Sequence, residues 1–192
     1  MDRFFEHFSK WVHLSVAARA FIRRHGRVMS YLPEAYFMQP DERMPYWCLV
    51  LEGLACGYTL DEDGRRRIHW FALPMQGFAG VRHLYTPKKA GHYIQFLEVS
   101  TILRLPALRM REGKERFAEL SELLHVMKQR YIDQREKLVK VLQKPTASGR
   151  YATFMDEFLD VAARTKPEQQ MDFINVGRTQ FFEARKHRLH TK

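Results

Sequence analysis

The feature that most constrains the fold is a change of hydrophobic period between the middle and the last third of the chain. Up to Leu105, short runs of aromatic and aliphatic residues alternate with turn residues, which is typical of β-strands. From Gly113 to Gln143, apolar residues recur in steps of three and four, which is typical of one helix of roughly 45 Å. We therefore expect an α+β chain in which a β domain is followed by a long helix.

The predicted strands fall in the middle of the chain. The turn Asp61–Gly64 separates two of them, and its Asp63-Gly64 pair favours a tight hairpin. Several short strands at nearly regular spacing favour a sandwich or a barrel. The strand-like runs are 46-YWCLVLEG-53, 54-LACGYTL-60, 66-RRIHWFAL-73, 92-HYIQFLEV-99 and 101-TILRL-105.

Helices are predicted on either side of this region. Residues 2–24 carry apolar side chains at helical spacing, and Ser15 is a suitable N-cap for a second helix there. After the long helix, 144-KPTASGR-150 contains the helix breakers Pro and Gly. The remaining segments have the plan of a helix-turn-helix unit. They are a helix over 151–162, a short helix near Glu168–Ile174, a turn at Asn175–Gly177 and a last helix from Arg178 to about His190.

The long helix carries an apolar stripe over about four heptads. The stripe consists of Phe117, Leu120, Leu124, Met127, Tyr131, Leu138 and Val141, and Gln134 interrupts it. Either the helix packs this stripe on its own domain, or two copies of the chain pair along it. Pairing is favoured because one small β domain can hardly cover so long a stripe. We therefore expect a homodimer with a dimerisation helix.

Composition points to an acidic partner. The chain has 192 residues, a formal net charge of +10 and 45% hydrophobic residues, so it can build a core and still carry a large basic excess. Such an excess favours polyanionic partners, with nucleic acid first and a membrane surface second. A basic protein without any such partner is the alternative. Cys48 and Cys56 lie in apolar strand-like runs and are expected to be buried thiols.

Motifs of common catalytic sites do not occur in the chain, namely GxSxG, HExxH, the P-loop and GxGxxG. We expect no enzyme, and we predict no catalytic residue, metal site or cofactor. His187 and His190 share a helix face but would need further ligands to hold a metal. No stretch approaches about 18 consecutive apolar residues and no signal peptide opens the chain, so we expect no membrane span and a cytoplasmic protein.

The order of these elements resembles a known family. The run 31-YLPEAYFMQPDERMPYWCLVLEGLACGYTLDEDGRRRIHWFAL-73, with Leu51–Gly53, Asp61–Gly64 and His69–Ala72, is similar to the cyclic-nucleotide-binding-type β-roll of Crp/Fnr transcription regulators. The resemblance implies N-terminal helices with an antiparallel β-roll (a double-stranded β-helix or jelly roll) as sensor domain over 1–112. It further implies a dimerisation helix over 113–144 and a helix-turn-helix DNA-binding domain over 145–192, here expected to lack a full wing.

The resemblance also permits a test of the sensor's ligand chemistry. Family members that bind cyclic nucleotides use a Phe-Gly-Glu segment for the ribose and a later Arg for the phosphate. Here Gly80 stands in place of the Glu and Ala90 in place of the Arg. Classical cyclic AMP binding is therefore not expected, and the effector is unknown. The candidate effector residues are Phe78, Gly80, Arg82, Lys88, Lys89 and His92, although the charged ones are more simply explained as solvated surface residues.

The same resemblance places DNA contacts on the last helix. Ile174-Asn175-Val176-Gly177 fills the family's turn, where Asn175 tolerates the left-handed conformation. Phe173, Ile174, Val176 and Phe181 are expected to form the small core of the unit. The residues expected to face a duplex are Arg178, Thr179, Gln180, Arg185, Lys186 and Arg188. The departures from the family pattern are Met171 in place of a small Ala, and Phe182-Glu183 in place of Ser-Arg.

Three functions are compared on this basis. The leading hypothesis is a dimeric transcription regulator of the Crp/Fnr type, binding DNA through the C-terminal helix-turn-helix, with a sensor pocket that has lost the usual cyclic-nucleotide ligands. The alternative is a β-roll protein-interaction module that does not bind DNA, favoured by Phe182, Glu183 and the missing wing. An enzyme is the weakest choice.

Overall fold

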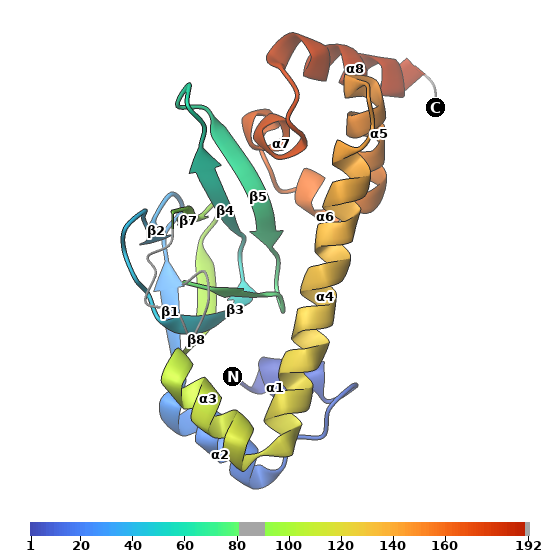
Figure 1. Cartoon of the computed structure of the whole chain (residues 1–192). Helices are drawn as coiled ribbons and strands as arrows, with labels where there is room; N and C mark the ends of the chain where they lie inside the picture. Colours follow the sequence, from blue (N-terminus) through green and yellow to red (C-terminus); the bar gives the residue numbers. More distant parts are fainter. Residues whose placement is uncertain (81–90, 191–192) are drawn as a thin grey trace. The chain divides into compact units, whose positions relative to one another are not determined.

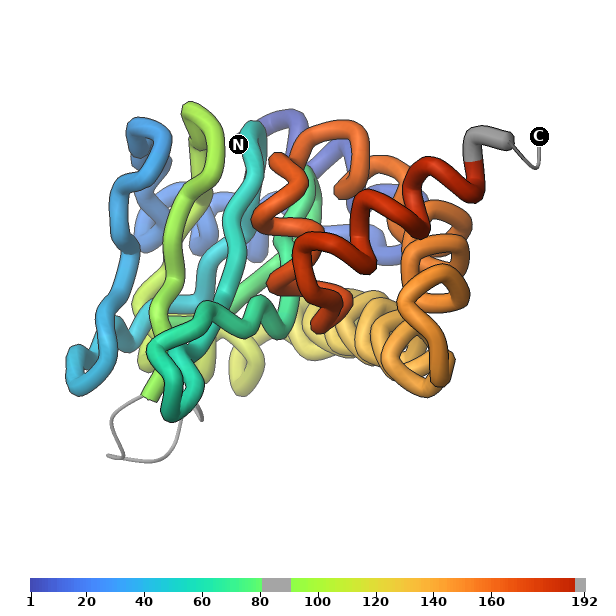
Figure 2. The backbone as a smooth tube through the Cα atoms, turned by 90° about the horizontal axis from the view of Figure 1, so that it is seen from above, coloured from blue at the N-terminus to red at the C-terminus, as the bar shows by residue number. Residues whose placement is uncertain are grey.

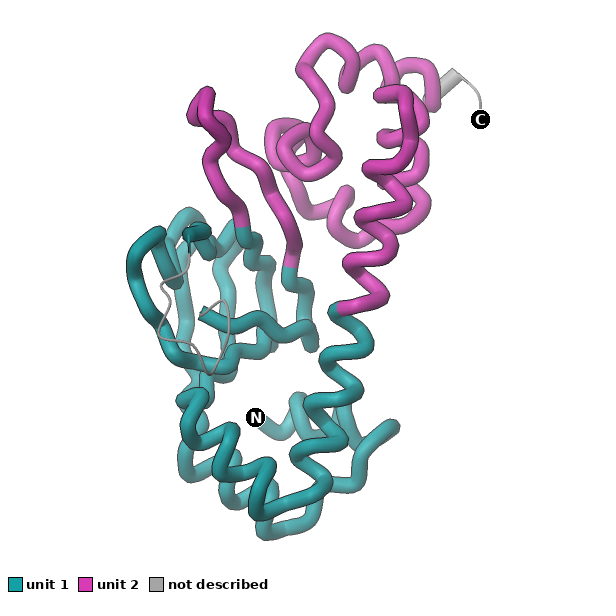
Figure 3. Tube along the Cα trace, viewed as in Figure 1, with its two compact units in different colours: residues 1–57, 72–131 teal, residues 58–71, 132–192 magenta. Residues whose placement is uncertain are grey.

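A computed structural model describes residues 1–80 and 91–190, with no side-chain description for residues 189 and 190. Within this described part the chain is α+β, with eight helices and eight strands (Figure 1). The chain divides into two compact units (Figure 3). Unit 1 comprises Met1–Gly57 and Ala72–Tyr131, and unit 2 comprises Tyr58–Phe71 and Ile132–Lys192.

Unit 1 begins with two helices, α1 (Asp2–Phe8) and α2 (Val16–His25), as the apolar spacing predicts. Ser15 caps α2, because its hydroxyl oxygen accepts a hydrogen bond from the Ala18 amide at 3.2 Å. These helices belong to a large hydrophobic cluster with one face of the first sheet. Its fully buried members include Phe4, Phe8, Ala18, Leu49, Leu103, Leu120 and Leu123.

The first sheet has the strand order β1-β8-β3-β6 and lies in unit 1. Its strands are β1 (Arg27–Tyr31), β8 (Ser100–Pro106), β3 (Tyr46–Glu52) and β6 (Gly77–Ala79). β8 runs antiparallel to β1 and to β3, and β3 runs antiparallel to β6, so that Cys48 stands opposite both Arg104 and Phe78. The sequence runs at 46–53 and 101–105 therefore form strands as predicted, whereas β1 and β6 were not predicted. β6 has only three residues and β1 is largely exposed, so neither shows the alternating pattern of a half-buried strand.

The second sheet has the strand order β2-β7-β4-β5. Its strands are β2 (Tyr36–Met38), β7 (Tyr93–Phe96), β4 (Ala55–Leu60) and β5 (Arg66–Ala72). The predicted hairpin between β4 and β5 is confirmed. Asp61 closes it, because its Oδ1 accepts hydrogen bonds from the amides of Asp63 at 3.1 Å and Arg65 at 2.8 Å. Gly64 adopts φ +73°, which only glycine takes up at low cost.

The helical stretch predicted from Gly113 is two helices, α3 (Ala107–Arg116) and α4 (Ala118–Leu142). Phe117 separates them with extended backbone, at φ −133° and ψ 107°. Gly113 lies inside α3, where an added Cβ would come within 2.8 Å of Leu120 and 2.9 Å of Phe21. The close packing of α2, α3 and the start of α4 therefore depends on Gly113. The sequence pattern had predicted this glycine at the start of the long helix.

Much of the predicted seam is buried within the single chain. Leu120 is fully buried, and Met127 and Leu138 are 9% and 6% exposed. Leu120 and Met127 belong to the hydrophobic cluster of unit 1, together with residues of α1, α2 and α3. The pairing argument assumed that only a small β domain could cover the stripe, and it did not include these helices. The large apolar side chains that α4 exposes are Tyr131, which belongs to the predicted seam, and Ile132, Val139 and Leu142, which do not. They form an exposed apolar strip beside the buried stripe.

Unit 2 holds the C-terminal helices, whose course can be followed in Figure 2. They are α5 (Ala147–Glu157), α6 (Leu159–Ala162), α7 (Pro167–Ile174) and α8 (Arg178–His190). The predicted helix over 151–162 is interrupted at Phe158, whereas the short helix, the turn and the last helix lie as predicted. The hairpin end of β4 and β5 belongs to the same unit. It is joined to α4 there, since Gln134 donates to the Phe71 carbonyl at 2.9 Å and Arg135 to the His69 carbonyl at 3.0 Å.

Candidate functional site

The turn between α7 and α8 is set by a left-handed residue. Asn175 has φ 54° and ψ 57°, as the sequence predicted for this position. The Val176 amide donates back to the Met171 carbonyl at 3.2 Å, which ends α7. The Phe181 amide then donates to the Gly177 carbonyl at 2.9 Å, so the first turn of α8 forms directly after Gly177. Three residues thus connect the two helices.

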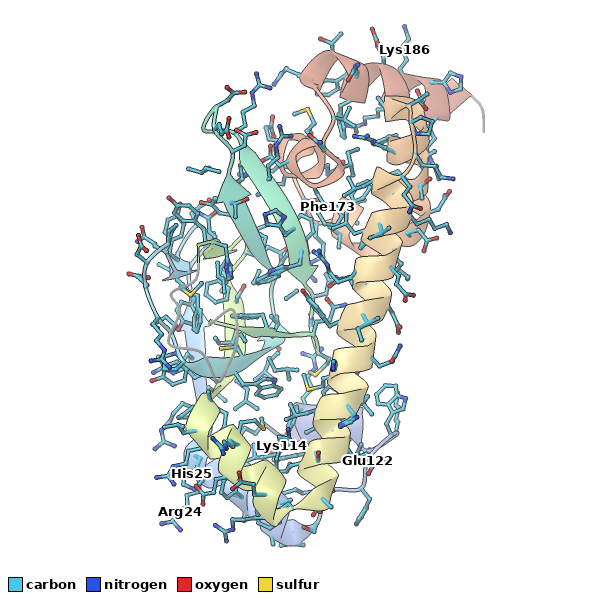
Figure 4. The ribbon with its side chains drawn as sticks, viewed as in Figure 1. Arg24, His25, Lys114, Glu122, Phe173 and Lys186 are labelled. Carbon is cyan, nitrogen blue, oxygen red and sulfur yellow. The ribbon has the colours of Figure 1, made fainter. Side chains whose placement is uncertain are left out.

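A cluster of aromatic rings supports this turn. Phe173 is 2% exposed, and its ring lies 5.1 Å from Phe158, 5.9 Å from Phe154 and 4.8 Å from Phe71. Phe181, on α8, is fully buried beside Tyr151, with the ring centroids 5.2 Å apart. Phe173 is labelled in Figure 4.

The predicted core of Phe173, Ile174, Val176 and Phe181 is confirmed for three of its members. Phe173, Ile174 and Phe181 are buried, whereas Val176 is half-buried. The contribution of Phe71 was missed, because nothing in a strand pattern indicates that its residue packs against a helix about 100 positions later.

Two hairpin arginines also contact this region within unit 2. Arg66 donates from Nε to Asp172 of α7 at 2.6 Å, and both side chains are about one quarter exposed, at 26% and 25%. Arg67 forms a hydrogen bond with the side chain of Asn175 and an ion pair with Asp61 at 2.8 Å. The turn is therefore fixed to the hairpin as well as to its own helices. The sequence offered no signal for this, since Arg65-Arg66-Arg67 resembles any solvated basic run.

Five of the predicted DNA-facing residues share the exposed side of α8. Phe181 and Ala184 face the core, which leaves Arg178, Thr179, Gln180, Arg185 and Lys186 exposed. Figure 4 shows Lys186 on the outer side of α8. Arg178 also places its guanidinium 5.5 Å from the ring centroid of Phe182, which is 39% exposed. Glu183 is exposed as well.

Arg188 differs from these five residues. It donates to the Ala152 carbonyl at 2.9 Å and pairs with Asp156 at 2.7 Å. Its side chain is 24% exposed. In this arrangement Arg188 holds α8 against α5, so its predicted contact with a duplex would require both interactions to break.

The candidate effector residues are only partly described. Arg82, Lys88 and Lys89 lie outside the described residues. Phe78 is buried in β6, and His92 is half-exposed just before β7. Phe78 packs against Phe37, with ring centroids 5.4 Å apart, and Phe37 lies beside Tyr31 and Phe96. Aromatic side chains therefore occupy the inner face of the first sheet at this point.

Gly80, one of the candidate effector residues, has no room for a side chain. A Cβ at this position would lie 2.3 Å from the Met44 carbonyl oxygen and 2.8 Å from the Phe37 ring. Neither atom is the end of a flexible chain, so any larger residue requires the backbone to shift. Local packing therefore favours glycine at this position.

Cys48 and Cys56 are buried thiols, as expected. Among the described residues, no group of three or more His, Cys, Asp or Glu side chains is placed to hold a metal ion. No helix in that part of the chain combines the length and the apolar character needed to cross a membrane.

Comparison with known proteins was made by sequence and by structure. No protein-family model and no curated protein matches the sequence. Solved structures do match. FixK2 from Bradyrhizobium japonicum superposes with a TM-score of 0.71 at 20% identity, covering 86% of this chain and 85% of that chain. TTHB099, a CRP-family transcriptional regulator from Thermus thermophilus, superposes with a TM-score of 0.68 at 14% identity, covering 83% of each chain.

A third similar structure is a cyclic nucleotide-binding domain containing protein from Listeria monocytogenes. Its TM-score is 0.74 at 11% identity, and the match covers 91% of this chain and 89% of that chain. The chain has the Crp/Fnr fold. The resemblance drawn from residues 31–73 is thereby confirmed for the fold. The Crp/Fnr fold also accounts for the order of elements from the N-terminal helices to the paired helices α7 and α8.

Proposed function

We propose that the protein is a dimeric transcription regulator of the Crp/Fnr type that binds DNA through α7 and α8. The observation that carries this proposal is the exposed face of α8. α8 begins directly after a three-residue turn that is supported by the aromatic cluster. Its exposed residues include Arg178, Thr179, Gln180, Arg185 and Lys186. In a helix-turn-helix, early residues of the second helix contact base edges and arginines contact phosphates or guanine.

Charge supports the same proposal. The net charge of +10 attracts a polyanion, and α8 carries its exposed basic residues against one carboxylate, Glu183. A carboxylate on such a face repels phosphate, but it accepts a hydrogen bond from a cytosine amino group. We therefore assign Gln180 and Arg178 to base edges, and Arg185 and Lys186 to the backbone.

The exposed apolar strip of α4 supports pairing of two chains. Tyr131, Ile132, Val139 and Leu142 are between 37% and 50% exposed, which is unusual for four large apolar residues on one helix. A second copy of α4 would cover them by antiparallel or parallel packing of like strips. In this proposal the dimer uses the strip, together with the half-buried Leu124 of the predicted seam, rather than Leu120, Met127 and Leu138.

The sensor is proposed to have lost cyclic AMP as its ligand. What supports this is the crowding at Gly80, where a Glu side chain cannot be placed without moving Met44 and Phe37. A cyclic nucleotide would then lack the carboxylate that accepts its ribose hydroxyl. The regulator would respond to another effector, or to none.

Fluorescence anisotropy with the gene's upstream DNA and a scrambled duplex tests DNA binding. We expect tight binding to the upstream DNA that survives scrambled competitor and weakens steeply between low and near-physiological salt. Gln180→Ala should weaken preference between the two duplexes, and Lys186→Ala should weaken binding to both. Arg24→Ala removes an equal charge from an exposed site on α2 and serves as control.

Equal, salt-labile binding of both duplexes would count against the proposal, because the electrostatics of a basic protein are then sufficient. So would an effect of Arg24→Ala as large as that of Lys186→Ala. The alternative of a protein-interaction module, with Phe182 as part of its contact surface, would take precedence in either case.

A further inference from the structure

One arginine lies on the inner face of the first sheet. Arg104, on β8, stands directly opposite Cys48 of β3 in the antiparallel register, and Cys48 in turn stands opposite Phe78 of β6. Residues directly opposite in such a ladder point to the same side of the sheet. Cys48 is fully buried and Phe78 is 8% exposed, so this is a covered face. Arg104 itself is half-buried, which leaves part of its side chain accessible.

The guanidinium of Arg104 is not neutralised by the protein. Its Nε is buried and has no hydrogen-bond partner in the described part of the chain. No carboxylate among the described residues forms an ion pair with it. Its contacts are aromatic, with the guanidinium carbon 4.9 Å from the ring centroid of Tyr46. Tyr31 is also close, since burial raises the pKa of its hydroxyl, whereas the charge of Arg104 and a side-chain hydrogen bond with Arg104 oppose that rise.

An unpaired donor in such a place costs free energy. A buried N–H without a partner loses its hydrogen bonds to water and gains none in return, and the loss is greater when the group is charged. The surrounding residues compensate the guanidinium through the ring of Tyr46 and a hydrogen bond with the Tyr31 side chain, and the Nε–H stays without a partner. Tyr31 is itself stacked on Phe96, with centroids 4.3 Å apart. A planar guanidinium with a free N–H, flanked by aromatic rings, matches an oxyanion such as a carboxylate or a phosphate.

We propose that Arg104 anchors a binding site for a small ligand that carries an oxyanion, either a carboxylate or a phosphate, on the inner face of the β1-β8-β3-β6 sheet. Arg104 donates from Nε and the adjacent Nη to the two oxygens of the ligand. Tyr46 and Tyr31 border the site. The charge thus comes from β8, on a rigid strand, and no carboxylate at position 80 is required. The site would be the effector site of the proposed regulator and rests on that function for its biological role.

The test measures binding to the full chain in the absence of DNA, so its result is independent of whether the chain regulates transcription. Isothermal titration with inorganic phosphate and with benzoate, at constant ionic strength, separates the two sources of oxyanion. Cyclic AMP and sodium chloride are titrated in parallel. We expect saturable binding of at least one oxyanion, and a rise in the thermal unfolding temperature with its concentration.

Arg104→Met keeps the length of the side chain and removes the charge. We expect affinity for the bound oxyanion to fall at least tenfold, while Arg24→Met, which removes an exposed arginine on α2, leaves it unchanged. In buffer free of oxyanions, Arg104→Met should unfold at the same temperature as the parent chain or higher, because a buried unpaired N–H is removed. A structural arginine would behave in the opposite way.

Three outcomes would overturn the proposal. Neither phosphate nor benzoate binds saturably, or Arg104→Met binds as tightly as the parent chain, or Arg104→Met lowers the unfolding temperature in oxyanion-free buffer. Loss of sequence-specific DNA binding in the anisotropy experiment, with oxyanion binding through Arg104 retained, would reject the regulator and leave the site in place.

Discussion

Arg66 of the β4–β5 hairpin and Asp172 of α7 form an ion pair of 2.6 Å, although 106 positions separate them in the sequence. The pair fixes the strand to the first helix of the proposed DNA-binding unit. Both side chains are about three quarters buried, so the contact is less screened by salt than a surface pair.

Arg66→Ala is expected to destabilise unit 2 by about 1–2 kcal/mol, because Asp172 would keep its charge in a partly buried position without a partner. Urea denaturation and hydrogen exchange of the α7 amides measure the effect. Arg65→Ala is the matched control, since Arg65 is an exposed neighbour in the same hairpin. Equal losses for the two variants would show that the ion pair contributes nothing specific.

Gly80→Ala is expected to destabilise unit 1 by about 1–3 kcal/mol, the usual cost of forcing an extra group into a packed site. The added Cβ would lie 2.3 Å from the Met44 carbonyl oxygen. Thermal unfolding provides the measurement. Gly91→Ala is the control, because a Cβ there meets no described atom within 4 Å. If Gly80→Ala unfolds at the parent temperature, the explanation given for the missing Glu is wrong.

Val139→Glu is expected to convert the proposed dimer into a monomer, with the dissociation constant raised on the order of 100-fold, since a carboxylate would be buried without a partner. Val139 is 50% exposed in the single chain, so the fold itself should tolerate the change. Analytical ultracentrifugation measures the mass, and circular dichroism checks the helix content. Gln129→Glu introduces the same charge at an exposed position elsewhere on α4 and should leave the mass unchanged. A parent chain that sediments as a monomer would rule out pairing along the strip.

The stability of unit 2 is expected to fall as the pH drops below about 6.5. Burial lowers the pKa of His69, and the nearby charge of Arg135 lowers it further. His69 is neutral in the fold, within 2.7 Å of the Thr59 hydroxyl, whereas the unfolded chain takes up a proton at the ordinary pKa. Stability is therefore complete above the unfolded pKa and is lost as the pH falls from there through the folded pKa.

His69→Gln should flatten this pH dependence in urea denaturation series between pH 7.5 and about 5. Some dependence should remain, because burial also lowers the pKa values of His7 and His25 in unit 1. His125→Gln, at an exposed site, should reproduce the parent curve. An unchanged slope in His69→Gln would assign the acid sensitivity to other groups.

Local patterns predicted those elements whose residues carry their own signal. Asp63-Gly64 predicted the hairpin because few dipeptides fit such a turn, and Asn175 predicted the left-handed turn for the same reason. The spacing of apolar residues predicted α1, α2 and α8. The short strands β1, β2 and β6 carry no period and were missed. The break at Phe117 was missed because helical spacing continues through it.

Burial of the α4 stripe shows a different limit. The heptad pattern correctly predicts a helix with one apolar side, but it does not say what covers that side. Leu120 and Met127 pack with α1 and α2, whose contribution depends on chain reversals far from α4 in sequence. The exposed strip at Tyr131, Ile132, Val139 and Leu142 is visible only once the buried residues are known.

By itself, the sequence determined the class of the fold, the order of its elements, the left-handed turn before α8 and the exposed basic character of that helix. These features follow from propensities and periods that act over a few residues. Only the tertiary structure decided that Arg66 pairs with Asp172, that Gly80 has no room for a side chain, that Arg188 is engaged with α5, and that the Nε of Arg104 has no hydrogen-bond partner on a covered face. The reason is physical, because each depends on atoms brought together from distant segments, and no local pattern records which segments meet.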